Sequence, residues 1–255
     1  MTTTFLKRFQ NQFAFVLRHR PSSESSLLVD LFTEKSGRIT AIAKGARRLK
    51  SSYRGVLLPF QSLAVLFSGK GDVKTLTGAE PVGSRILLSR DHLMCGFYLN
   101  ELIIKMLYRY DPYEALYPVY ERALDELSSK LDAEFTLRRF EKHLLEQVGY
   151  GLHLQHDTST GLPIDEHVLY RYLPEVGPIA NTSNRSDGVL IHGDALIALD
   201  QEGVFTERVK RELKQLSRTV LATHLQGKPL NSRRMYAQLY PGKDSADTQA
   251  RHVEF

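Results

Sequence analysis

A run of basic side chains with no acidic residue among them is the part of the sequence best suited to binding a ligand. It lies within residues 37–54, GRITAIAKGARRLKSSYR. Alternating apolar residues at its start indicate a strand, and Gly45 allows a tight turn into a loop. Such a cluster suits the phosphates of a polyanion, although a solvated loop that binds nothing has the same composition. The cations of this segment beyond the strand are Lys44, Arg47, Arg48, Lys50 and Arg54.

The positive charge of the chain is concentrated in its first third. Residues 1–84 contain 13 Lys or Arg and 5 Asp or Glu, whereas the remaining residues contain 21 and 24. This asymmetry indicates a polyanion-binding module joined to a near-neutral body. The polyanion is nucleic acid or, as the alternative, an anionic membrane surface. Three further cations of the first third, Arg38, Lys70 and Lys74, are predicted to extend the binding surface.

Composition restricts the class of protein. Of the 255 residues, 42% are hydrophobic and 25% are charged, which is typical of a globular protein with a real core. No stretch approaches the roughly 20 apolar residues that span a bilayer, and the N-terminal residues do not resemble a signal peptide. The one cysteine, Cys95, lies in an apolar helical pattern and excludes an internal disulfide. We therefore expect a cytoplasmic protein.

The first third of the chain has the periodicity of strands. Five short alternating segments between Gln12 and Val82 are separated by turn residues, which predicts a small closed barrel. An OB-type barrel is the leading candidate and an SH3-like barrel is the alternative. The segment Gly69-Lys-Gly-Asp resembles a phosphate-binding loop only superficially, because it lies between two predicted strands, and it is interpreted as a hairpin turn.

The rest of the chain is predicted to be mainly helical, which makes the fold class α+β. We expect a barrel domain over residues 1–84 and a helical domain over 85–255, with a loop-rich insertion at about 150–200 that contains one hairpin. Asp91 is predicted to cap the first helix. The expected helices cover residues 91–111, 113–131, 134–148, 206–225 and 232–239, and the expected hairpin strands cover 168–172 and 177–180.

No set of residues has the spacing of a catalytic centre. The chain contains no nucleophile elbow, kinase signature or dinucleotide fingerprint, so we predict neither an enzyme nor a cofactor. Histidines and one carboxylate gather in the glycine-rich middle, but their spacing does not provide the four ligands of a structural zinc site. We predict no metal. These residues are His153, His156, Asp157 and His167.

A second basic group lies in the predicted helix over residues 134–148. It is interpreted either as an ordinary helix face, with Glu141 and Glu146 as ion-pair partners, or as a basic rim around an apolar pocket. The second arrangement would suit an acidic peptide with an apolar end. The candidate residues are Arg138, Arg139, Phe140 and Lys142.

Short blocks spread over nearly the whole chain carry a family resemblance. They are Ala14-Phe-Val-Leu, Glu24-Ser-Ser-Leu-Leu, Leu31-Phe-Thr-Glu, Gly37-Arg, Ala43-Lys-Gly-Ala-Arg47, Leu58-Pro-Phe, Val73-Lys-Thr-Leu, Ala79-Glu80, Tyr98-Leu-Asn-Glu-Leu, Leu137-Arg-Arg-Phe-Glu141, Leu144-Leu, Gly149-Tyr-Gly151, Leu225-Gln-Gly-Lys-Pro-Leu and Ser232-Arg233. With these blocks in this order, the sequence resembles the RecO family of bacterial recombination mediators. The resemblance implies an OB fold, a helical domain and an insertion that holds a four-cysteine zinc site in some members. Because residues 149–192 contain no cysteine, the chain resembles the zinc-free branch.

The resemblance also implies a function. RecO-like proteins bind single- and double-stranded DNA, anneal complementary strands and, with RecR, help load RecA onto strands coated by single-stranded DNA-binding protein. Some members grip the acidic tail of that protein, and here Arg138 and Arg139 match the motif. These implications add nucleoid association to the expected cytoplasmic location.

Two alternative functions follow from the residues alone. An RNA-binding OB-fold protein would have the same basic surface, because that surface does not distinguish ribose from deoxyribose. A nucleotide-hydrolysing repair enzyme is disfavoured, because the phosphate-binding loop is missing. Aromatic side chains also stack on bases in many single-strand binders, and Tyr53 and Phe60 are either stacking residues or core residues.

Overall fold

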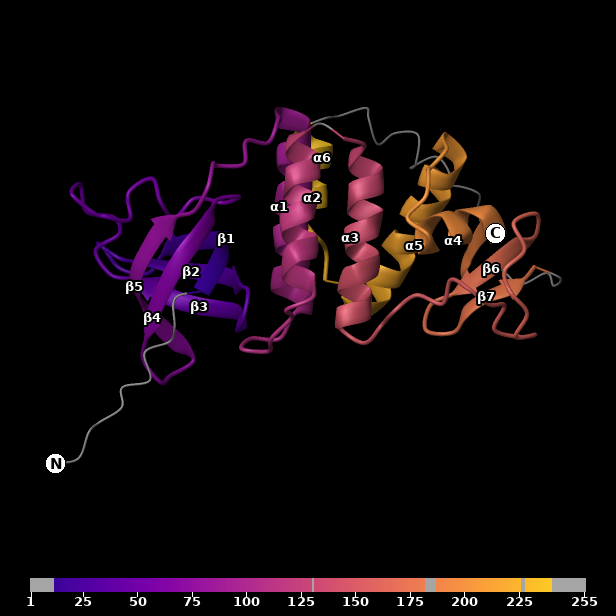
Figure 1. Cartoon of the computed structure of the whole chain (residues 1–255), viewed down its shortest axis with the longest axis horizontal. Coiled ribbons are helices and arrows are strands. Elements are labelled where there is room, and N and C mark those ends of the chain that lie inside the picture. The colour runs from indigo at the N-terminus through magenta and orange to yellow at the C-terminus, as the bar shows by residue number, and fades with distance from the viewer. Residues whose placement is uncertain (1–11, 130, 182–186, 226–227, 240–255) are drawn as a thin grey trace.

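The computed structural model describes residues 12–129, 131–181, 187–225 and 228–239. A barrel lies at one end, a group of helices in the middle and a small sheet at the other end (Figure 1). The strands of the barrel end at Pro81 and the first helix begins at Arg90.

The N-terminal strands form a closed barrel, as predicted. The strand order is β1-β2-β3-β5-β4; β3 and β5 are parallel, and the other neighbours that are paired are antiparallel. A five-stranded barrel of this order is an OB fold. The prediction of an OB-type barrel is therefore confirmed, and the SH3-like alternative is excluded. The Gly69-Lys-Gly-Asp turn joins β4 to β5, with Ser68 paired to Thr75, so the predicted hairpin is confirmed. The strands are β1 (Gln12–Pro21), β2 (Leu27–Thr33), β3 (Gly37–Ala43), β4 (Ser62–Ser68) and β5 (Val73–Pro81).

The barrel and the helices share an aromatic core. Side chains on one face of the strands fill the barrel, whereas Phe15 and Phe32 on the other face belong to the core of the helical domain. The ring centroid of Phe15 lies 5.6 Å from that of Tyr117 and 5.2 Å from that of Tyr120. Fully buried rings of this size contribute about 1.5–3 kcal/mol each, so the barrel is fixed on the helices.

Buried hydrogen bonds also join the barrel to the helices. The side chain of Asn100 donates to the backbone oxygen of Leu17 at 2.9 Å and accepts from the Tyr120 hydroxyl at 2.5 Å. At Gly37, with φ of 62°, a side chain would collide with the backbone of Asp111. Glycine at this position therefore allows the close approach of the two domains.

The helices agree with the predicted periodicity, apart from their ends. Asp132 caps α3 by accepting a hydrogen bond from the backbone of Glu134. The prediction that Asp91 caps the first helix is wrong, because Ser89 occupies the N-cap position and Asp91 lies within the first turn. No helix in the described ranges is long and apolar enough to cross a membrane. The helices are α1 (Arg90–Met106), α2 (Leu116–Ser128), α3 (Ala133–Gln147), α5 (Glu207–His224) and α6 (Asn231–Leu239).

The loop-rich insertion contains more regular structure than predicted. The hairpin is present as β6 (Leu169–Leu173) and β7 (Gly177–Ala180). A third strand, β8 (Val189–His192), pairs with the other edge of β6, and α4 (Gly193–Asp200) follows it directly. Both were missed, because four strand residues and eight helix residues are too short to show a periodicity. The polar tail after Gly242 lies outside the described residues.

Candidate nucleic-acid interface

The basic loop between β3 and β4 is built from consecutive turns. Gly45 adopts a φ of 72°, which lets the chain turn immediately after the strand. Hydrogen bonds from Arg48 N to Gly45 O at 3.0 Å and from Ser51 N to Arg48 O at 3.1 Å close the next turns. These backbone hydrogen bonds fix the loop, and its basic side chains are exposed.

Six of the eight predicted DNA-binding residues are exposed. None of the six forms an ion pair with a carboxylate in the described part of the chain, and two donate only to backbone oxygens. Arg47 Nη1 donates to Ser23 O at 2.8 Å and Arg54 Nη1 donates to Leu49 O at 3.3 Å. A cation with no carboxylate partner can bind a phosphate without breaking an ion pair. The six residues are Lys44, Arg47, Arg48, Lys50, Arg54 and Lys70.

Arg38 and Lys74 lie in a different environment, at the contact between the barrel and the helices. Arg38 is half-buried and donates from Nε to the backbone oxygen of Leu107 at 3.2 Å. Burial and the neighbouring Arg109 lower its pKa. Lys74 is buried, and its Nζ lies 5.0 Å from the ring centroid of Tyr110. The two residues help to hold the domains together, and their contact with DNA stays a prediction.

The two aromatic candidates for base stacking are used for packing. Phe60 is 3% exposed, and its ring centroid lies 5.2 Å from that of Phe97 on α1. Tyr53 is half-buried against the barrel core, and its hydroxyl donates to the backbone oxygen of Leu76 at 2.9 Å. Phe60 is therefore a core residue, and Tyr53 helps to fix the basic loop on the barrel.

A buried carboxylate that sequence reasoning missed, Asp30, organises the outer face of β2 and β3 near Arg38. Asp30 on β2 accepts from Arg18 Nε at 2.6 Å and from the Thr40 hydroxyl at 2.6 Å. Burial raises the pKa of Asp30, but the hydrogen bonds from Thr40 and Arg18 outweigh this effect and leave it below its ordinary value. On the same strand as Arg18, Arg20 is exposed and adds a further cation. In the sequence, the alternation of Arg18 and Arg20 on either side of His19 is the signal that indicates this outer face of the barrel.

The lowered pKa of Asp30 predicts a loss of stability in acid. Its charged form is favoured in the folded protein, so its contribution is complete above the unfolded pKa of about 3.9 and disappears as the pH falls through the folded value. We expect Asp30→Asn to cost about 1–3 kcal/mol at pH 7. Urea unfolding of both proteins at pH 7 and at pH 3 measures the difference, which must shrink at the lower pH. A difference independent of pH would contradict this assignment.

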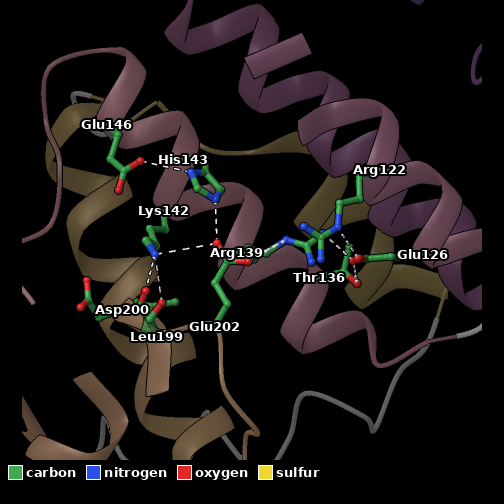
Figure 2. Close-up of polar contacts among 10 residues, drawn as sticks. All are labelled: Arg122, Glu126, Thr136, Arg139, Lys142, His143, Glu146, Leu199, Asp200 and Glu202. Atoms are coloured by element: carbon green, nitrogen blue, oxygen red, sulfur yellow. Dashed lines mark hydrogen bonds and ion pairs between the residues drawn. The ribbon is translucent and has the colours of Figure 1, made fainter. Parts of the chain in front are cut away.

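The second predicted site lies inside the helical domain. Arg139 on α3 is 2% exposed and pairs with Glu126 of α2 at 2.6 Å (Figure 2). Lys142 donates to the backbone oxygens of Leu199 and Asp200, at 3.3 and 2.8 Å, at the end of α4. Glu202 lies between the two cations, 3.8 Å from each. These side chains join three helices.

Arg138 is also buried, on another face of the same helix. Its Nη1 lies 3.1 Å from Oε2 of Glu141. The other carboxylate oxygen of Glu141 accepts a hydrogen bond from the Tyr98 hydroxyl at 2.5 Å. Phe140, which lies between Arg138 and Glu141 in the sequence, is fully buried. The expected basic rim is therefore not exposed in this structure, and Arg138, Arg139, Phe140 and Lys142 are core residues. Arg138 pairs with Glu141 of its own helix, Arg139 pairs with Glu126 of α2, and Lys142 donates to backbone oxygens of α4.

The residues considered as metal ligands are dispersed. His153, His156 and His167 are exposed, whereas Asp157 is buried and accepts hydrogen bonds from the backbone of Ser159 at 2.8 Å and of Ala180 at 2.9 Å. Asp157 thus holds the loop before β6 against β7. Within the described residues, no group of three or more potential ligands is arranged to hold a metal ion.

Comparison with known proteins gives one consistent result. Residues 8–85 match the family described as recombination protein O N terminal, and residues 87–234 match recombination protein O C terminal. The chain is 41% identical over 230 residues to the DNA repair protein RecO of Nitrosospira multiformis, with 90% of this chain and 95% of the relative covered. It is also 41% identical, over 227 residues, to the RecO proteins of Haemophilus influenzae, with 89% and 95% covered, and of Vibrio parahaemolyticus, with 89% and 93% covered.

The two family matches fall on the two parts of the structure. The first covers the barrel with its basic loop, and the second covers α1 to α5 and the start of α6. Relatives that match over nine tenths of their own length leave no large part of the fold unmatched. The chain therefore belongs to the RecO family of DNA repair and recombination proteins.

Proposed function

We propose that the protein binds single- and double-stranded DNA through backbone phosphates and that the exposed cations of the barrel are the contacts. The observation that carries the proposal is the set of six exposed basic side chains, none of which has a carboxylate partner among the described residues. Contacts of this kind are independent of base sequence and sensitive to salt. A surface built this way leaves the base edges free, because it holds the strand by its phosphates.

Annealing of complementary strands follows from the same surface. Two strands repel each other through their phosphates, and a surface that neutralises both lowers this repulsion and raises their encounter rate. Base pairing then supplies the specificity. This activity breaks no covalent bond, so the proposed function needs no catalytic residue and no cofactor.

The protein is further proposed to act with partners in the cytoplasm, in association with the nucleoid. With RecR it would help load RecA onto strands coated by single-stranded DNA-binding protein, whose acidic tail it would bind. Support for a tail contact at α3 comes from Arg138 Nε and Arg139 Nη1, which are buried without a hydrogen-bond partner among the described residues. Because both residues are buried, a tail would reach them only after the neighbouring side chains move.

An annealing assay tests this proposal. Complementary oligonucleotides, bare or coated with single-stranded DNA-binding protein, are mixed with the protein without ATP, and duplex formation is followed over time. We expect annealing of both substrates by the wild type and loss of both activities when Lys44, Arg47, Arg48 and Lys50 are replaced by alanine. Absence of annealing by the wild type would contradict the proposed function. Annealing by the variant at the wild-type rate would remove the basic loop from it.

RNA binding is the alternative function, favoured by the same observation, because phosphate contacts do not select the sugar. Competition between DNA and RNA oligonucleotides of matched sequence separates the two functions. DNA must compete at least as well as RNA if the proposal is right, and a clear preference for RNA would contradict it.

A further inference from the structure

A cavity of about 470 Å³ lies beside the basic loop, where the loop meets the turn between β1 and β2. This turn contains four serines, which form one wall, and the basic loop contributes two cations to the other wall. No carboxylate lines the cavity in the described part of the chain. We call it the serine pocket; its polar lining residues are Ser22, Ser23, Ser25, Ser26, Lys44 and Arg48.

Hydrogen bonds fix the two walls of the serine pocket relative to each other. The backbone nitrogen of Arg47 donates to Ser25 O at 3.0 Å, and its guanidinium donates to Ser23 O at 2.8 Å. Within the turn, Ser26 N donates to the Ser23 hydroxyl oxygen at 3.2 Å, and Ser22 N donates to Ser26 O at 3.0 Å. Arg47 thus joins the two loops, and the pocket exists before any ligand arrives.

The groups around the serine pocket match the chemistry of a phosphate. Hydroxyls donate hydrogen bonds to phosphate oxygens, a lysine supplies a point charge and an arginine supplies paired donors. Lys44 and Arg48 form no ion pair within the described residues. A Cβ on Gly45 would lie 3.6 Å from Arg48 Cδ, so the arginine stem lies over the glycine at the edge of the pocket.

We propose that the serine pocket binds a single phosphate group of a DNA strand. This inference rests on the proposed DNA binding and adds a fixed point to it. The exposed cations hold a strand at any register, whereas the pocket, with hydroxyls on one side and cations on the other, holds one phosphate in a defined position. Arg47 is a positioning residue here, because its hydrogen bonds to Ser23 and Ser25 hold the wall of the pocket in place.

The phosphate has two possible sources, which short oligonucleotides distinguish. One source is an internal phosphodiester of the strand, and the other is a terminal phosphomonoester. Binding of a 5′-hydroxyl and a 5′-phosphorylated oligothymidylate of equal length is compared for the wild type and the pocket variant described below. Equal affinities that both depend on the pocket assign it to a phosphodiester. An advantage of the 5′-phosphate that disappears in the variant assigns it to a strand end.

The test variant removes hydroxyls and no charge. Ser22→Ala, Ser25→Ala and Ser26→Ala are combined, and Ser23 is kept because its side-chain oxygen accepts a hydrogen bond within the turn. Loss of neutral hydrogen bonds to a phosphate predicts roughly tenfold weaker DNA binding, with the salt dependence of binding unchanged because every cation remains. The matched control replaces three exposed serines outside the pocket and outside the proposed DNA contacts, Ser84, Ser89 and Ser129, and must bind as the wild type does.

A second measurement does not depend on the variants. Inorganic phosphate is titrated into the wild-type protein at constant ionic strength, and the amide resonances of residues 22–26 and 44–48 are followed by NMR. These resonances must shift with phosphate more than with chloride.

The failure of this inference is distinct from the failure of DNA binding. If the alanine variant of the four loop cations loses DNA but the triple-serine variant binds as the wild type does, the surface binds DNA and the pocket does not hold a phosphate. If phosphate shifts no resonance of the two loops, the pocket is equally overturned. If the wild type binds no DNA at all, the proposed function and this inference are both overturned.

Discussion

Replacing Lys44, Arg47, Arg48 and Lys50 by alanine is expected to weaken binding of single-stranded DNA on the order of 100-fold at about 0.1 M salt, since each lost phosphate contact also loses its counterion release. The four side chains are exposed on the basic loop and form no ion pair with a described carboxylate. Their removal therefore leaves no buried charge without a partner. The loss of affinity is measured by fluorescence anisotropy with a labelled oligonucleotide, and circular dichroism confirms that the variant is folded.

A control for total charge accompanies this variant. Arg85, Arg211, Lys228 and Arg234 are four exposed cations outside the basic loop, and their replacement by alanine changes the net charge by the same amount. We expect this control to bind DNA within a fewfold of the wild type. If both variants lose affinity equally, the net charge of the chain binds DNA and the basic loop has no special role.

Arg139→Ala is expected to destabilise the fold by about 3–5 kcal/mol, because it removes the buried partner of a mostly buried carboxylate, whose remaining ion-pair partner is exposed. The side chain of Arg139 is 2% exposed and that of Glu126 is 13% exposed, and their charged groups lie 2.6 Å apart. The variant would also disturb Glu202, which lies between Arg139 and Lys142. The shift of the urea midpoint at constant slope measures the loss of free energy of unfolding.

The same carboxylate provides the matched control. Arg122 also pairs with Glu126, at 3.1 Å, but its side chain is 64% exposed. Arg122→Ala should cost no more than about 1 kcal/mol, because exposed ion pairs contribute little. Adding Glu126→Gln to Arg139→Ala should recover part of the loss, since it removes the negative charge that has lost its buried partner. If Arg139→Ala is as stable as the wild type, the buried network is not structural and the residue is free to serve a partner.

The barrel was predictable from sequence because residues that face its core alternate along each strand with residues that face outward. Val29 and Leu31 alternate with Leu28 and Asp30, and one set fills the barrel. The strand β8 and the helix α4 were not predictable in the same way, because each is too short to show a period. The strand β8 is held in place by pairing with β6 and by contact with α5, and neither partner is adjacent to it in the sequence.

The two candidate sites also differ in how much of their structure could be predicted from sequence. Exposure of the loop from Lys44 to Arg54 could be predicted, because a run of cations without an acidic residue cannot enter a core. The burial of Arg139 could not, since its partners Glu126 and Glu202 come from other elements. Lys74 is hidden for a similar reason, under a tyrosine that follows it by more than thirty residues in the chain. Charge patterns within one helix do not reveal partners that folding brings together.

The most direct test of the account is the salt dependence of DNA binding. The association constant for a single-stranded oligonucleotide is measured between about 50 and 200 mM salt for the wild type and for the alanine variant of Lys44, Arg47, Arg48 and Lys50. If all four contact phosphates, the slope of log K against log salt concentration becomes shallower by about 2.8, at roughly 0.7 for each lost contact. An unchanged slope would contradict the central claim that this loop binds the DNA backbone.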